Sequence, residues 1–254
     1  MLEVKNLSKK FINKKKGEIT HVEAVKNVSF QCIPGKIFGL LGPNGAGKTT
    51  TLRCASTLLK PTGGNVFLDE YDVINNGKMI RSRIGFLTTD MKLDGFFTPD
   101  YMISYFGKLN KMENNIIQKR KEILFKDLKM EDFIDKKIDK LSSGMKQKTA
   151  IAISLIHDPD VIIFDEPTNG LDVITAKNVT DFLQKYAQRG KTVIISTHIM
   201  SVVEKLCDTV GILINGELKE LGTLDEIIKG NQAADLEEVF FKYILPEDEL
   251  ENIK

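Results

Sequence analysis

The sequence predicts an α/β fold built on a mostly parallel β-sheet. Short, unbroken apolar runs, such as residues 161–164 and 192–196, have the length of strands that are buried on both faces. Segments with the spacing of helices, such as residues 145–157 and 175–189, alternate with these runs. Because strands that alternate with helices form parallel sheets covered on both faces, this pattern sets the fold class.

The first third of the chain predicts an N-terminal antiparallel β part. Runs rich in β-branched residues occupy 2–7, 22–33 and 36–41, and a Gly-rich loop and a helix at 48–59 follow them. Further elements are expected as strands at 65–69, 84–87 and 209–214, and as a helix at 200–207.

A mainly helical insert is predicted between residues 99 and 140. Lys, Glu, Ile and Leu recur there at helical spacing, and clusters of β-branched residues are few. The tail from Leu224 is also charged and helical. Residues 236 and 239–241 give the tail an apolar face, which we expect to pack back on the core.

Composition excludes several classes of protein. The 36 Lys and Arg residues balance 35 Asp and Glu, so the net charge of +1 provides no basic field for nucleic acid, and we expect no nucleic-acid partner. Cys32, Cys54 and Cys207 have neither disulfide nor zinc spacing, which favours free thiols in a reducing compartment. No apolar run approaches the roughly 18–20 residues of a membrane span, and the start lacks a signal-peptide pattern, so we expect a chain that neither spans nor crosses a membrane.

A phosphate-binding loop is predicted between an apolar strand and a helix. The segment matches G-x-x-x-x-G-K-[ST] with the residues Gly42, Pro43, Asn44, Gly45, Ala46, Gly47, Lys48 and Thr49. Its glycines let backbone N–H groups turn toward phosphate oxygens, and the positive end of the next helix faces the same anions. Lys48 is expected to reach the β and γ phosphates, Thr49 to ligate Mg²⁺ and Thr50 to donate to the α phosphate. The motif predicts the core of a P-loop NTPase.

Two carboxylates end the buried strand at residues 161–164. Because the carboxyl ends of parallel strands meet at one edge, Asp165 and Glu166 are expected beside the phosphate loop. Asp165 would hold Mg²⁺ through water, and Glu166 would orient or deprotonate the attacking water. His198 ends another buried strand, where we favour a sensor of the γ phosphate over a structural histidine.

The segment 141–147, Leu-Ser-Ser-Gly-Met-Lys-Gln, resembles the signature L-S-G-G-Q of ABC ATPases. With the phosphate loop, the acidic pair, a D-loop ending at Asp172 and His198, it follows the motif order of that family. The resemblance implies a head-to-tail dimer with a second copy, in which one chain's signature covers ATP on the other chain's phosphate loop. It assigns ATP contacts to Ser142, Ser143, Gly144 and Asp172. A helix start with free N–H groups is suited to that role.

Two positions depart from the family pattern. Ser143 replaces the second signature glycine and keeps its backbone N–H. Thr89 stands where the family has the Q-loop glutamine, and Asp90 follows it. We consider both as Mg²⁺ ligands, Thr89 through water, while a solvated loop acid is the alternative for Asp90.

The resemblance also implies an aromatic contact with adenine. Phe11 lies where the family has its A-loop, and its position relative to Val25 fits stacking of its ring on the base. A core phenylalanine is the alternative.

The family pattern implies a single nucleotide-binding domain over residues 1–254. Residues 1–89 and 158–222 would form the ATP-binding core, 90–157 a helical signature subdomain and 223–254 a C-terminal helical tail. An integral-membrane transporter subunit is the expected partner. It would place the chain in the cytoplasm, peripheral on the inner face of the cell membrane.

Within the family, the missing Q-loop glutamine and the segments 84–97 and 234–240 look like ATPases of ABC-2 exporters. The run 85–93 looks most like subunits for sodium extrusion. Export of drugs or other small molecules, an importer ATPase and a soluble ABC protein are the alternatives. A GTPase is disfavoured because no N-K-x-D motif is present.

Overall fold

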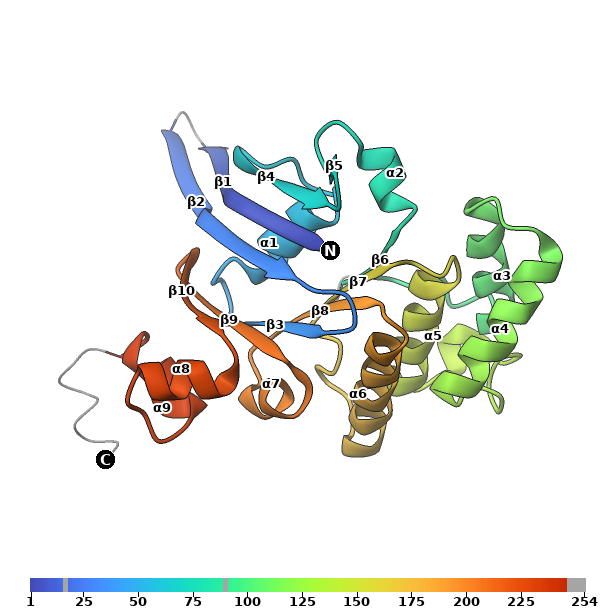
Figure 1. Cartoon of the computed structure of the whole chain (residues 1–254). Helices are drawn as coiled ribbons and strands as arrows, with labels where there is room; N and C mark the ends of the chain where they lie inside the picture. Colours follow the sequence, from blue (N-terminus) through green and yellow to red (C-terminus); the bar gives the residue numbers. More distant parts are fainter. Residues whose placement is uncertain (16–17, 89–90, 246–254) are drawn as a thin grey trace.

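The computed structural model describes residues 1–15, 18–88 and 91–245. These residues form an antiparallel sheet, a second and mostly parallel sheet, and helices around them (Figure 1). The helices of the insert lie at one end of the molecule and the C-terminal helices at the opposite end (Figure 1). The predicted α/β class with an N-terminal antiparallel part and a helical insert is confirmed.

The antiparallel sheet has the strand order β2-β1-β4-β5 among the described residues. Its strands are β1 (Leu2–Lys15), β2 (Glu18–Cys32), β4 (Gly63–Leu68) and β5 (Tyr71–Asp72). The prediction ended the first strand at residue 7, but the ladder from Lys10↔Glu23 to Lys15↔Glu18 extends it. Charged residues interrupt the apolar pattern there, and cross-strand hydrogen bonds hold the strands instead.

The second sheet has the order β10-β9-β3-β8-β7-β6 in the described part of the chain. The strands are β3 (Ile37–Leu41), β6 (Ile84–Leu87), β7 (Val161–Asp165), β8 (Thr192–Thr197), β9 (Thr209–Ile214) and β10 (Glu217–Gly222). All neighbours pair in parallel except β10, which is an antiparallel edge. The carboxyl ends of β3, β7 and β8 therefore meet at one edge of the sheet.

The helices cover both sheets and fill the insert. They are α1 (Lys48–Ala55), α2 (Gly77–Arg81), α3 (Pro99–Leu109), α4 (Asn114–Leu128), the 3-10 turn η1 (Ile138–Lys140), α5 (Ser143–Leu155), α6 (Val173–Gln188), α7 (Met200–Leu206), α8 (Leu224–Gly230) and α9 (Leu236–Lys242). α3, α4 and α5 lie between β6 and β7 in the chain. None of the described helices has both the length and the hydropathy of a membrane span.

The sequence-based prediction missed three elements, β5, α2 and β10, and made one helix too long. β5 and α2 are too short for a periodic pattern to stand out. β10 is as long as β9, but its sequence ELKELG is charged and lacks the apolar run that marked the other strands of this sheet. The predicted helix 48–59 ends at Ala55, because the backbone turns left-handed at Thr57, with φ 66°.

The apolar residues pack in three clusters. One joins the insert to the parallel sheet, with Leu124 and Leu128 of α4 near Ile151 of α5. A second fills the space between the two sheets around α1. The third holds the tail, where Leu236, Val239 and Phe240 are buried with residues of β9, as the sequence predicts.

Candidate nucleotide-binding site

The loop between β3 and α1 is pressed against its neighbours so closely that two positions admit only glycine. A Cβ atom on Gly47 would lie 2.3 Å from the Ala24 carbonyl oxygen, and Gly47 has φ 103°. A Cβ atom on Gly42 would lie 2.2 Å from the Leu213 carbonyl oxygen. This close approach fixes the loop over the sheet edge and aims the start of α1 into the cavity beside it.

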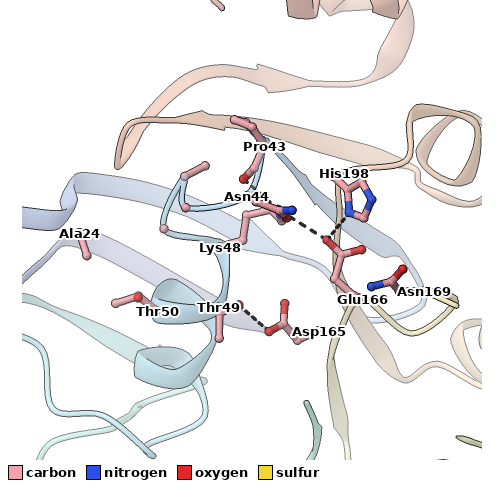
Figure 2. Close-up of a pocket in the computed structure, with 13 residues that line it drawn as sticks. Ala24, Pro43, Asn44, Lys48, Thr49, Thr50, Asp165, Glu166, Asn169 and His198 are labelled. Carbon is pink, nitrogen blue, oxygen red and sulfur yellow. Dashed lines mark hydrogen bonds and ion pairs between the residues drawn. The ribbon is translucent and has the colours of Figure 1, made fainter. Parts of the chain in front are cut away.

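Lys48 lies inside this loop. Its side chain is only 6% exposed, and Nζ donates to the carbonyl oxygens of Gly42 at 2.7 Å and Pro43 at 3.1 Å. Nζ also lies 3.6 Å from Oε1 of Glu166 (Figure 2). An ammonium group held in this way presents a fixed positive charge to an anion in the cavity.

Asp165 ends β7 beside the loop. The Thr49 hydroxyl donates to Asp165 Oδ2 at 2.6 Å (Figure 2). The Ser196 hydroxyl donates to Oδ1 of the same carboxylate. These hard oxygen donors fit Mg²⁺, which keeps several waters and binds one or two protein oxygens together with phosphates. The described residues contain no group of three or more His, Cys, Asp or Glu placed to hold a metal ion.

The backbone of Glu166 is left-handed, with φ 51°. Its N–H donates to the Ser196 carbonyl at 3.0 Å, and its carbonyl accepts from Asn169 N–H at 3.2 Å. The carboxylate, 12% exposed, turns into the cavity, where His198 Nδ1 lies 2.9 Å from Oε1 (Figure 2). Lys48, Glu166 and His198 therefore converge at the edge where β3, β7 and β8 end.

These groups line a cavity of about 340 Å³. Its walls are Ala24, Pro43, Asn44, Gly45, Ala46, Gly47, Lys48, Thr49, Thr50, Asp165, Glu166, Asn169 and His198. The structure thus brings together the predicted phosphate loop, acidic pair and histidine, although they come from distant parts of the sequence.

Other predicted residues lie outside that wall. Phe11 is half-exposed on β1, with Lys9 Nζ 5.2 Å from its ring centroid, and Val25 is fully buried in the core. Ala24, the residue before Val25, lines the cavity instead. Thr89 and Asp90 lie outside the described residues, so their role as ligands stays a prediction.

The predicted signature residues form a separate polar surface at the start of α5. Ser142 caps this helix by accepting from the Met145 N–H at 3.3 Å. Ser142 and Ser143 are exposed and Gly144 is buried, and none of the three lines the cavity.

Asp172 likewise caps α6, and it also lies outside the cavity wall. Its Oδ1 accepts from the N–H groups of Ile174 and Thr175, both at 3.0 Å. The hydrogen bond from the Thr175 hydroxyl lowers the pKa of Asp172 below its usual value.

Sequence reasoning missed Ala24, Asn169 and Ser196. Ser196 is the register partner of Asp165 in the parallel pair β7 and β8. A polar residue at the end of a second apolar strand indicates such a neighbour, but only once the strand order is known. Asn169 and Ala24 reach the cavity through a turn and an adjacent strand, for which the sequence contains no separate pattern.

Comparison with known proteins gives a consistent result. A family model described as "ABC transporter" matches residues 25–169. The ABC transporter ATP-binding protein NatA of Bacillus subtilis is 37% identical over 96% of this chain and 98% of its own length. The methionine import ATP-binding protein MetN 1 of Bacillus cereus is 36% identical over 91% of this chain and 67% of its own. The Nod factor export ATP-binding protein I of Ralstonia nicotianae is 35% identical over 92% of this chain and 72% of its own length.

Solved structures are also similar. An ATP-binding subunit of an ABC transporter superposes with a TM-score of 0.83 at 26% identity, covering 96% of this chain and 99% of that one. A dimer of the ATP-binding cassette MJ0796, in a post-hydrolysis state with ADP and Pi bound, gives a TM-score of 0.79 at 29% identity. This second match covers 88% of this chain and 99% of the cassette.

Proposed function

The chain belongs to the ABC transporter family, and from that premise we propose that it is the ATP-hydrolysing subunit of an exporter with a separate membrane subunit. ATP hydrolysis is a general property of these cassettes, so the chain is an ATPase. We divide it into an ATP-binding core at 1–89 and 158–222, a signature subdomain at 90–157 and a tail at 223–254.

The observation that supports the proposal best is the convergence of Lys48, Glu166 and His198 on one cavity. Lys48 would bind the β and γ phosphates as a fixed cation, and the N–H groups of the loop would bind the remaining oxygens. Glu166 would accept the proton of the attacking water. His198 would hold the Glu166 carboxylate and contact the γ phosphate, since its Nδ1 lies 2.9 Å from Glu166 Oε1 and its ring lines the same cavity.

Thr49 and Asp165 are the residues we assign to Mg²⁺, and when bound the ion would neutralise charge on the phosphate oxygens. The Thr49 hydroxyl donates to Asp165 at 2.6 Å, which keeps both oxygens beside the phosphate loop. Thr50 lines the same wall and is assigned to the α phosphate, and Phe11 to the adenine ring.

Ser142, Ser143 and Asp172 are exposed at their helix starts, Gly144 is buried beside the two serines, and all four lie outside the cavity of their own chain. We therefore assign them to the ATP of a second copy, arranged head to tail. The dimeric state of the similar cassette MJ0796 supports this arrangement. ATP would then act as a cross-link that draws two chains together.

Transport requires a channel, which we assign to an integral-membrane partner that holds this chain on the cytoplasmic face. For the cargo we propose sodium, on the likeness of residues 85–93 to sodium-extrusion subunits. The names of similar proteins include both import and export, and transport assays on reconstituted vesicles distinguish the two directions.

Vesicles that contain this chain together with its proposed integral-membrane partner provide such an assay. ATP-dependent movement of sodium across the vesicle membrane, abolished by Glu166→Gln, is the expected result. Sodium movement that does not depend on ATP would contradict the assignment of cargo. ATP-dependent movement of a drug or another small molecule in place of sodium would favour the alternative exporter.

A further inference from the structure

A hydrogen bond joins the signature helix to the segment that carries Glu166. Gln147 lies in the second turn of α5, and its side-chain Nε2 donates to the Pro167 carbonyl oxygen at 3.0 Å. Pro167 is buried and directly follows Glu166 in the chain. The side-chain amide of Gln147 therefore bonds to the residue that directly follows Glu166, to which we assign water activation.

The Glu166 segment has an unusual conformation that needs support. Its left-handed φ of 51° is disfavoured for a residue with a side chain. The Glu166 backbone is held by Ser196 on one side and by Asn169 on the other. The bond from Gln147 fixes the next carbonyl along the chain, so it helps set where the Glu166 carboxylate points.

A second contact ties the start of α5 to the start of α6. A Cβ atom on Gly144 would lie 2.9 Å from the Thr175 side chain, so the two helix starts pack without space between them. Thr175 is in turn bonded to Asp172 through its N–H at 3.0 Å and its hydroxyl at 2.7 Å. A displacement of the signature residues would thus move both α6 and the Pro167 carbonyl.

We propose that Gln147 is a positioning residue that couples the two ATP sites of the dimer. This inference rests on the proposed function, in which the signature of one chain covers the partner's ATP while Glu166 acts on its own. ATP at the partner's site would hold the start of α5 in place. Through its hydrogen bond, Gln147 would then hold the Pro167 carbonyl, and with it the Glu166 carboxylate, in a matching position. Such coupling is reciprocal for binding, so each ATP favours the other.

The test compares two glutamine-to-leucine variants of the full chain. Gln147→Leu removes the donor and keeps a side chain of similar size. Gln184→Leu is the matched control, because Gln184 Nε2 also donates to a backbone carbonyl, that of Lys205 at 3.4 Å, on the exposed face of α6 away from the cavity. ATP hydrolysis is measured against ATP concentration for both, with ATP affinity and thermal unfolding measured on each monomer.

Gln147→Leu is expected to lower kcat about fivefold, the equivalent of one neutral hydrogen bond, and to bring the Hill coefficient toward one. Its monomer should bind ATP with unchanged affinity, and Gln184→Leu should keep the wild-type kcat and Hill coefficient. An unaltered kcat and Hill coefficient in Gln147→Leu would overturn the coupling role, and so would an equal loss in both variants. A wild-type chain that hydrolyses ATP without dimerising would instead refute the dimer of the proposed function, and the coupling with it.

Gln147→Glu separates positioning from simple loss of structure. A carboxylate there accepts and does not donate, so it repels the Pro167 carbonyl at neutral pH, whereas a protonated carboxyl regains a donor. Relative to wild type, the activity of Gln147→Glu should recover as the pH falls toward the carboxyl pKa. A constant ratio of the two activities across pH would contradict a hydrogen-bonding role.

Discussion

The edge of the parallel sheet and the start of α5 both carry predicted ATP contacts. Within one chain, only the contacts at the sheet edge converge on a common cavity. At the sheet edge, Glu166 already lies 3.6 Å from Lys48 and 2.9 Å from His198. At the start of α5, Ser142 and Ser143 are exposed and face none of these groups. The difference teaches that the phosphate-loop groups converge within one chain, whereas the predicted contacts at α5 lie apart from them, as the proposed head-to-tail dimer requires.

The largest expected effect is at the sheet edge, with Glu166→Gln. The amide cannot accept the proton of the attacking water, so kcat should fall by about 10²–10⁴-fold, while ATP binding and ATP-induced dimerisation persist. Single-turnover hydrolysis and size-exclusion chromatography with ATP measure the two properties. Turnover at the wild-type rate would remove Glu166 from the mechanism.

Lys48→Ala should have the next largest effect, and on binding itself. It removes a buried cation from the phosphate loop, so ATP affinity should fall by about 10–100-fold, which corresponds to charged hydrogen bonds worth about 1.5–3 kcal/mol. Titration with a fluorescent ATP analogue gives the affinity. Retained affinity would contradict the assignment of Lys48 to the phosphates.

Ser142→Ala tests the other side of the comparison. The monomer should bind ATP as the wild type does, because Ser142 does not line its own cavity. ATP-induced dimerisation should weaken by about fivefold, through loss of one hydrogen bond to the partner's ATP. Analytical ultracentrifugation at several ATP concentrations measures this, and weakened ATP binding in the monomer would argue against a site shared between chains.

Thr223→Ala should have the smallest effect on ATP chemistry, because Thr223 lies far from both regions. Its hydroxyl accepts from the Glu226 N–H at 3.3 Å in a capping box at the start of α8. Its loss should reduce the stability of the tail by about 1 kcal/mol. Hydrogen exchange should show faster opening of α8 and α9 with hydrolysis unchanged, and a loss of hydrolysis would link the tail to the site.

Much of the site was predictable because its parts are local in sequence. The backbone path of residues 42–49 depends on glycines at fixed spacing, and Gly42 and Gly47 are the positions where a Cβ atom has no room. Asp165, Glu166 and His198 follow apolar strands directly, so the rule that parallel strands end at one edge placed them together. The position of Lys48 in the phosphate-loop motif was enough to predict its place at the site.

The remaining features depend on which strands and helices become neighbours. The sequence alone determined the α/β class, the phosphate loop and the residues that end the strands, because short-range periodicity and backbone geometry encode them. Only the tertiary structure decided that Ser196 lies beside Asp165, that Ala24 and Asn169 reach the cavity and that Gln147 bonds to Pro167. Those contacts join residues through strand order and helix packing, which no local pattern in the chain specifies.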